Sequence, residues 1–155
     1  MLSYLPSELG WERFHASCEP ALIHAVERCI QEHPGAVVAL GAGHTHPTDP
    51  SLRPRVAQAL KGAFVVLLRP TPDADRSVQI LRERCRRAKW TDWQIDGVDW
   101  IHRWCTDQQD EQLADATVYT EGQSPEQVAT EIVTRLQHHE AQTHPPAEQV
   151  RREIS

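Results

Sequence analysis

The sequence predicts an α/β protein: one domain with a small parallel sheet of about three strands, flanked by helices. Three short apolar runs have the length and composition of strands, and segments with an apolar face at helical spacing lie between them. Strands that alternate with helices indicate βαβ units and therefore a parallel sheet. The chain of 155 residues is long enough for one such domain. We assign the domain to residues 1–137 and expect a flexible tail over residues 138–155.

The first half is predicted to contain two helices and two strands. A helix should begin at Pro20, because proline suits a first helical turn, and it should end near Pro34. Residues 36–40 are apolar and bounded by glycines, which is typical of a strand buried on both faces. A second helix is expected after Asp49, and residues 63–68 form the second predicted strand.

The second half continues the alternation. The next helix should follow residues 71–72 and carry an apolar face at Val78, Leu81 and Cys85, and residues 116–120 form the third predicted strand.

The last helix has the clearest start signal. Ser124 and Gln127 have the spacing of a capping box, with Pro125 at the first helical position. Its predicted buried stripe is Val128, Ile132 and Leu136.

Composition favours a cytoplasmic protein that acts on small molecules. The formal net charge is −6, which disfavours binding to nucleic acids or anionic membranes. The four cysteines form no C-x-x-C pair, and Cys29 and Cys85 lie among apolar helix positions, where a free cysteine acts as a small apolar residue, so we expect a reducing compartment. The N-terminus lacks a signal-peptide pattern, and no run approaches the ~20 apolar residues of a membrane span. We therefore expect neither a nucleic-acid nor a membrane partner.

A glycine- and histidine-rich turn follows the first predicted strand. It contains Gly41, Ala42, Gly43, His44 and His46. Ligands of parallel α/β sheets bind outside the carboxyl ends of the strands, where this turn should lie. If the turn is extended, the alternate side chains of His44 and His46 point the same way.

Three interpretations of the two histidines remain open. They can bind a divalent metal, with His15, His24 or Asp49 as a third ligand. They can act as general acid and base, since histidine titrates near neutral pH. They can also merely line a loop, with Asp49 serving only as a helix cap. We favour acid–base chemistry over metal binding and predict no metal or cofactor.

Four sequence segments together resemble the shikimate-kinase-like group of P-loop kinases, over roughly residues 11–136. "VVALGAG" is similar to the strand and glycine turn that contact the acceptor substrate, and "AFVVLLRPTPD" to the following strand and loop. "RERCRRAKW" falls at the lid, and "LADATVYTEGQSPEQVATEI" is similar to the last strand, the adenine loop and the final helix. The resemblance implies a truncated three-layer P-loop-kinase-like fold.

The chain departs from that family where phosphate is bound. It has no G-x-x-x-x-G-K-[ST] motif and no equivalent of the family's first strand, and the family's Phe-Arg pair is Phe14 and His15. We therefore predict that the chain alone is not a kinase. The lost strand is central in the family, so either the two flanking strands close up on each other or its place is filled by residues 2–5, by a second copy of the chain or by another protein. We favour a homodimer.

Further residues are candidates for the wall of a substrate pocket. His15 either faces the same pocket as the glycine turn or lies on the surface. Arg82, with Arg86 and Arg87, either closes over an anionic ligand or forms a solvated face. The tryptophans either wall an apolar pocket or belong to the core; they are Trp90, Trp93, Trp100 and Trp104.

The sequence thus predicts an ATP-independent enzyme of the isomerase, cyclase or lyase type, in secondary metabolism. His44, His46 and His15 are its expected catalytic residues, and the glycine-turn amides, Arg82 and the four tryptophans its expected substrate contacts. The alternative is a non-catalytic binding subunit or half of a split small-molecule kinase. A kinase fragment that lacks its upstream half is disfavoured by Met1.

Overall fold

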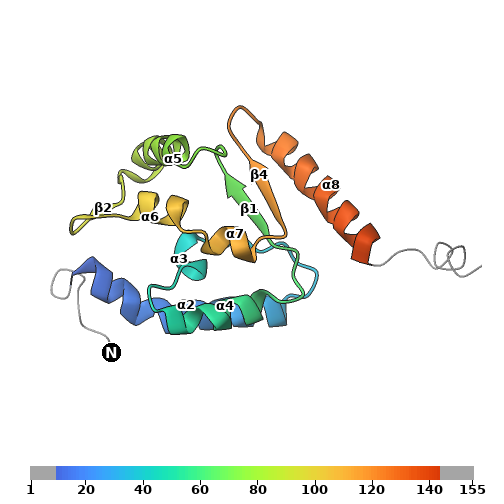
Figure 1. Cartoon of the computed structure of the whole chain (residues 1–155), viewed down its shortest axis with the longest axis horizontal. Helices are drawn as coiled ribbons and strands as arrows, with labels where there is room; N and C mark the ends of the chain where they lie inside the picture. Colours follow the sequence, from blue (N-terminus) through green and yellow to red (C-terminus); the bar gives the residue numbers. More distant parts are fainter. Residues whose placement is uncertain (1–9, 144–155) are drawn as a thin grey trace, which may run out of the picture.

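Two groups of elements make up the chain in the computed structural model, which describes residues 10–143 (Figure 1). A helical layer contains α2 (Trp11–Glu32), α3 (Ala42–Thr45), the short 3-10 turn η1 (Pro50–Leu52) and α4 (Arg53–Leu60). A sheet layer contains β1 (Val66–Arg69), α5 (Ala74–Lys89), β2 (Gln94–Ile95), β3 (Val98–Asp99), α6 (Trp100–Thr106), α7 (Gln109–Leu113), β4 (Ala116–Tyr119) and α8 (Pro125–Thr143). The segment 2–5 that was considered as a replacement strand lies outside the described residues.

The sheet is smaller than predicted. β1 and β4 pair in parallel, with Val66 opposite Ala116 and Arg69 opposite Tyr119, while β2 and β3 form a separate antiparallel hairpin. The described chain is 63% helical. The prediction of a mixed α/β protein with a small parallel sheet flanked by helices is confirmed, but the parallel sheet has two strands instead of about three.

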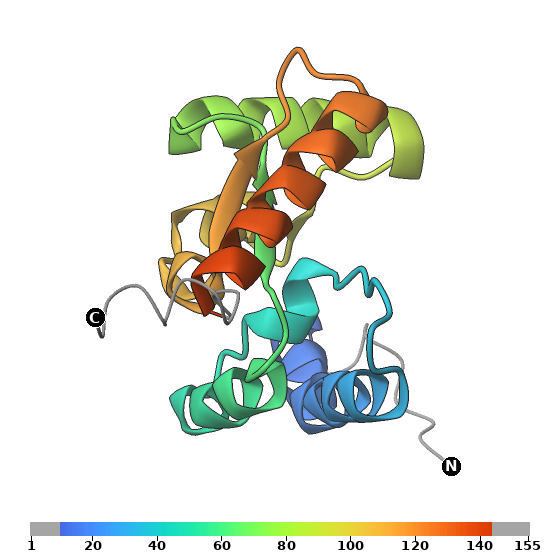
Figure 2. The same ribbon diagram turned by 90° about the vertical axis from the view of Figure 1, so that its right-hand side faces the viewer.

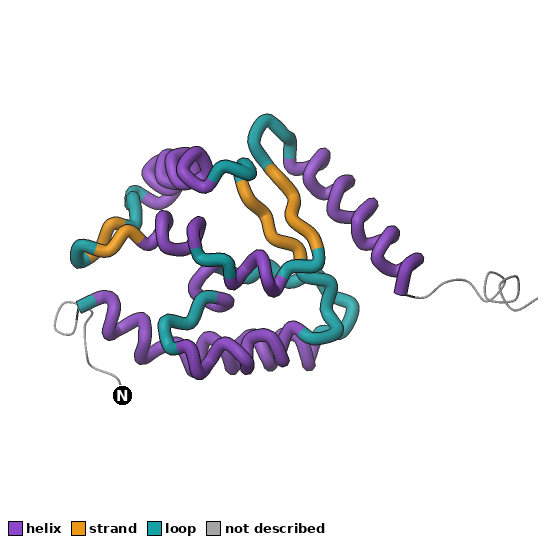
Figure 3. The backbone as a smooth tube through the Cα atoms, viewed as in Figure 1, coloured by secondary structure: helices purple, strands orange, loops and turns teal. Residues whose placement is uncertain are grey.

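The missing strand is the predicted one over residues 36–40. These residues run between α2 and α3 as a loop without a sheet neighbour (Figure 3). The side chain of Val37 is fully exposed, at 102% relative accessibility. A parallel strand requires a hydrogen-bonded neighbour and cover on both faces. Neither exists for this segment within the described residues, so composition alone gave the wrong prediction.

Helix α2 begins well before the predicted start at Pro20. It follows Gly10, whose φ of 75° places it in the left-handed region that favours glycine, and it continues to Glu32. Pro20 therefore lies inside the helix, where it has no N–H to donate to the preceding turn. Packing outweighs this loss, because α2 buries Ile23 and Val26 against α4.

The other helices agree more closely with the sequence. Val78 of α5 packs against Ile101 and Cys105 of α6, with Leu81 and Cys85 at the edge of the cluster, as the predicted face requires. In the predicted capping box of α8, the Ser124 N–H donates to Gln127 Oε1 (2.7 Å) and the Gln127 N–H donates to Ser124 Oγ (3.3 Å).

Helix α8 lies across the sheet beside β4 (Figure 2). Its predicted stripe is only half-buried, and no residue of the helix is buried. The helix runs to Thr143, beyond the predicted boundary at residue 137, and the remainder of the tail lies outside the described residues. None of the helices within residues 10–143 has the length and apolarity needed to cross a membrane.

Candidate functional site

A cavity of about 440 Å³ lies where the helical layer meets the sheet layer. Much of its wall is apolar and comes from α2, β1, α5, α6 and the loop before β2, through Trp11, Leu22, Leu67, Leu81, Trp93 and Trp104. Polar groups of α2, the glycine turn, the loop after α6 and α7 also reach it: His15, His44, Asp107 and Asp110. An apolar cavity with a few convergent polar groups is the usual form of a small-molecule site.

His15 is the best-positioned titratable side chain at this cavity. Its Nδ1 lies 3.3 Å from Glu19 Oε1, one turn further along α2. Its ring packs against Trp100, with 4.9 Å between ring centroids. These two contacts hold the imidazole with Nδ1 toward the carboxylate, so that Nε2 is the nitrogen available to the cavity.

Glu19 is itself held from the opposite side. It is 1% exposed and its Oε1 accepts hydrogen bonds from the Thr48 N–H and the Thr48 hydroxyl, both at 2.7 Å. The Asp49 N–H donates to Oε2 at 3.2 Å. A buried carboxylate requires such donors. They fix Glu19, and Glu19 in turn orients the imidazole of His15.

The glycine turn closes over His15. A Cβ added at Gly43 would lie 3.1 Å from His15 Nε2, so a larger residue here would press on the imidazole and displace it by a few tenths of an ångström. His44 also lines the cavity, and its Nδ1 lies 3.2 Å from the Gly41 carbonyl oxygen. The structure therefore brings together Gly41, Ala42, Gly43, His44 and His15 at one wall, as the sequence predicts.

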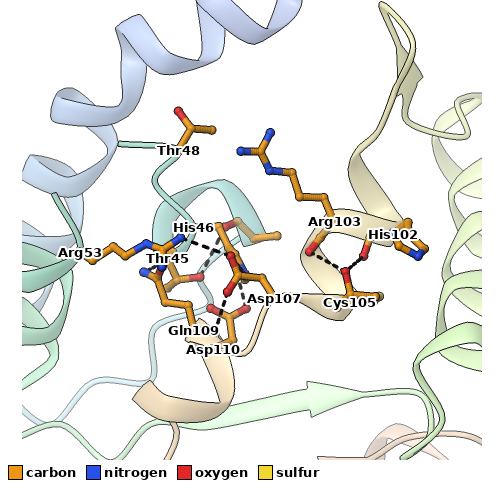
Figure 4. A network of polar contacts seen from close by, with 12 residues as sticks. Thr45, His46, Thr48, Arg53, His102, Arg103, Cys105, Asp107, Gln109 and Asp110 are labelled. Atoms are coloured by element: carbon orange, nitrogen blue, oxygen red, sulfur yellow. Dashed lines mark hydrogen bonds and ion pairs between the residues drawn. The ribbon is translucent and has the colours of Figure 1, made fainter. Parts of the chain in front are cut away.

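His46 does not join this group (Figure 4). It is 6% exposed, with Nδ1 at 3.2 Å from Asp110 Oδ2 and Nε2 at 3.9 Å from Asp107 Oδ2. Arg53 pairs with Asp107 at 3.6 Å, and Gln109 Nε2 donates to the Thr45 carbonyl at 2.6 Å. His46 thus connects the end of α3 to α7.

The expectation that His44 and His46 point the same way is wrong. It assumed an extended turn, whereas residues Ala42–Thr45 form one turn of helix. A metal-binding arrangement is also not found: no group of three or more His, Cys, Asp or Glu side chains among residues 10–143 is placed to hold an ion. Asp49 caps η1 by accepting from the Ser51 N–H (2.8 Å), and this bond lowers the pKa of its carboxyl.

The tryptophans divide into three groups. Trp93 and Trp104 line the cavity, together with Trp11, which the sequence did not single out. Trp100 is 1% exposed and belongs to the core beneath His15. Trp90 ends α5 with a φ of 57° and is 92% exposed, so the structure places it away from the cavity.

The predicted arginine lid is not arranged over the cavity. Arg82 forms an ion pair with Asp99 and does not line the wall. Arg86 pairs with Asp92 at 3.2 Å and Arg87 with Glu83 at 2.8 Å, as on a solvated face. A different arginine, Arg69 at the end of β1, does line the cavity and pairs with Glu111.

Two site features were missed at the sequence level. Glu19 follows His15 by four residues, and this i, i+4 spacing is a signal that was available once the helix was placed correctly. Cys105 lines the cavity, and burial raises the pKa of its thiol. Its position on α6 becomes apparent only from the packing of α6 against α5.

Comparison with protein-family models, with curated proteins and with solved structures gives no match for this chain. The function is therefore argued from the site alone.

Proposed function

We propose that this protein is an ATP-independent small-molecule enzyme that works by acid–base catalysis in the cavity beside His15. The observation that carries the proposal is the Glu19–His15 pair at the wall of an apolar cavity of about 440 Å³. A carboxylate that orients one imidazole nitrogen leaves the other free to accept or donate a proton. Isomerisation, cyclisation and elimination all need such a group.

In the proposed reaction, His15 Nε2 removes a proton from the bound substrate. Glu19, 3.3 Å from Nδ1, stabilises the imidazolium that forms. His44, at the same wall, is the candidate partner that returns a proton, and the amides of the glycine turn are candidates to hold developing negative charge. His46 is given a structural role instead, because Asp107 and Asp110 enclose it.

The proposed substrate has a flat apolar body. Trp11, Trp93 and Trp104 supply aromatic surface along one cavity, and aromatic side chains bind rings by offset or edge contacts. The cavity falls within the usual volume range of small-ligand pockets. We place the activity in the cytoplasm, a proposal consistent with the four free thiols.

The test uses 5-nitrobenzisoxazole, an aromatic probe that opens when a base removes its carbon-bound proton. The wild-type protein should accelerate this opening with saturation, and His15→Gln should reduce the rate to that of buffer. His24→Gln is the matched control, because His24 lies on the same helix with its side chain 62% exposed and should leave the rate unchanged. Equal rates for wild type and His15→Gln, with the fold intact by circular dichroism, contradict the proposal.

The second candidate is a non-catalytic binding subunit or half of a split small-molecule kinase, on a truncated three-layer P-loop-kinase-like fold. Parallel pairing of β1 with β4 and the position of α8 after β4 support the shikimate-kinase-like ancestry. The absence of a second neighbour for β1 among the described strands favours a partner chain. Calorimetry separates a self-sufficient kinase from the first proposal: Mg²⁺-dependent binding of ATP to the chain alone favours the kinase, and the first proposal predicts no heat.

A further inference from the structure

The cavity runs along the free edge of β1. Three successive residues of the strand, Leu67, Leu68 and Arg69, all line it. Successive side chains of a strand point to opposite faces of the sheet, so a hollow that touches all three lies along the edge. The other edge is paired with β4. Leu68 is 52% exposed, so this edge presents both unpaired backbone groups and apolar surface.

A second unpartnered extended segment occurs in the same chain. In residues 36–40, exposure alternates: Val38 and Leu40 are half-buried, whereas Val37 and Ala39 are exposed. Leu40 packs against the core of the helical layer and anchors one end. The segment therefore has the alternation of a strand with one covered face, but no sheet neighbour within the described part of the chain.

We propose that two copies of this chain pair through these features: residues 36–40 of each copy add as a strand to the β1 edge of the other. One sequence carries both halves of the contact, so two copies satisfy both edges in a closed two-fold dimer. Residues 36–40 carry no charge, and Arg69 at the end of β1 is already paired with Glu111. The two paired segments therefore bring no like charges together, and backbone hydrogen bonds supply the main attraction of the contact.

This inference goes beyond the proposed activity. The added strand would occupy the part of the cavity next to β1, and a substrate would bind between that strand and His15 and residues 41–43 of the helical layer.

The test measures the mass of the full chain by sedimentation equilibrium over a range of concentrations. The wild type should be a dimer, and Leu68→Lys and Val37→Lys should each be monomeric, because lysine blocks an edge strand. Val133→Lys on α8 is the matched control, since Val133 is also 52% exposed, and it should remain a dimer.

A mixing experiment tests the reciprocity. In a mixed dimer, the β1 edge of the Val37→Lys copy is unchanged and can pair with the unchanged segment 36–40 of the Leu68→Lys copy. One of the two contacts is then intact, so a fraction of the protein should dimerise on mixing. Hydrogen exchange should slow at Val37 and Leu68 only in preparations that contain dimer.

Four outcomes overturn the proposal. The first is a wild type that is monomeric at every concentration. The second is a Val133→Lys variant that is also monomeric. The third is that only one of Leu68→Lys and Val37→Lys is monomeric. A full chain that is monomeric but dimerises after removal of residues 1–9 shows instead that its own N-terminal segment covers the edge.

Discussion

The helical layer and the sheet layer differ in how completely they bury their apolar residues. In the helical layer, Ile23, Val26 and Val56 are at most 1% exposed and pack together between α2 and α4. In the sheet layer, Val118 of β4 is fully buried and Val78, Ile101 and Cys105 form a second buried cluster, but β1 has no buried residue and α8 has none within its described length. The elements β1 and α8 are thus covered on fewer sides than α2 and α4.

The difference follows from what each kind of element requires. A helix satisfies its backbone hydrogen bonds internally and needs only one apolar stripe to be covered. A parallel strand needs neighbours at its edges and cover on both faces. Two short strands and one helix lying across them provide only part of this. The free edge of β1 is therefore the part of the molecule to which a ligand or a partner strand can still add.

The largest expected effect comes from removing core volume in the helical layer. Ile23→Ala should lower the free energy of unfolding by about 2–5 kcal/mol, because a cavity remains among well-packed neighbours. Val128→Ala on the half-buried stripe of α8 should cost on the order of 1 kcal/mol. Urea unfolding of both variants measures the two values. Equal costs would show that the two layers are equally well packed.

The same contrast explains which elements the sequence could predict. The apolar face of α5 and the capping box at Ser124 are local patterns, and both are found. The strand at residues 36–40 was wrong because a strand depends on a distant neighbour that no local pattern reports. The start of α2 was missed because Pro20 resembles a helix start, while burial of Ile23 and Val26 keeps the proline inside.

In the candidate site, too, some residues could be predicted from local sequence and others could not. The glycine turn and His15 were identified from the sequence, and they lie at one cavity. Glu19 was missed because the predicted helix began at Pro20, which left His15 and Glu19 outside it, and because the donors that fix its carboxylate come from Thr48, 29 residues further along the chain. His46 was wrongly grouped with His44, because its partners Asp107 and Asp110 come from α7 and the loop before it, about 60 residues further along the chain.

The second prediction compares two carboxylates, one in each layer. Glu19→Gln should lower the free energy of unfolding by about 1–3 kcal/mol, because a neutral amide replaces a buried acceptor of three hydrogen bonds. It should also reduce the rate with 5-nitrobenzisoxazole. Glu131→Gln on α8, where a partly exposed carboxylate pairs with Arg135 (2.7 Å), should change neither measurement. Full activity in Glu19→Gln would remove Glu19 from the mechanism.

The third prediction concerns the cap of α8. Ser124→Ala should cost about 1 kcal/mol, since it removes a hydrogen-bond acceptor for the Gln127 N–H from a helix with little buried surface. Hydrogen exchange at the first turn of α8 should accelerate, while α2 amides should not change. The Ser124 hydroxyl also lowers the pKa of the Glu126 carboxyl, so this contribution is present above the ordinary pKa of 4.5 and is lost as pH falls below it. A cap effect of the same size in acid would contradict that coupling.

The smallest expected effect is a pH dependence at Cys105, which packs between α5 and α6. Burial raises the pKa of its thiol above the ordinary 9.0; the nearby Asp99 carboxylate raises it further, and Arg69 opposes the shift. The folded state therefore holds this proton to higher pH than the unfolded state, so the stabilisation is complete below pH 9.0 and is lost as pH rises above it. Urea unfolding at neutral pH and above pH 9.0 should show a larger loss in wild type than in Cys105→Ala. The other three thiols are common to both proteins, so a difference between the two losses belongs to Cys105. Equal losses would mean that Cys105 ionises as freely in the folded chain as in the unfolded one, and that the contact between α5 and α6 does not shield its thiol from water.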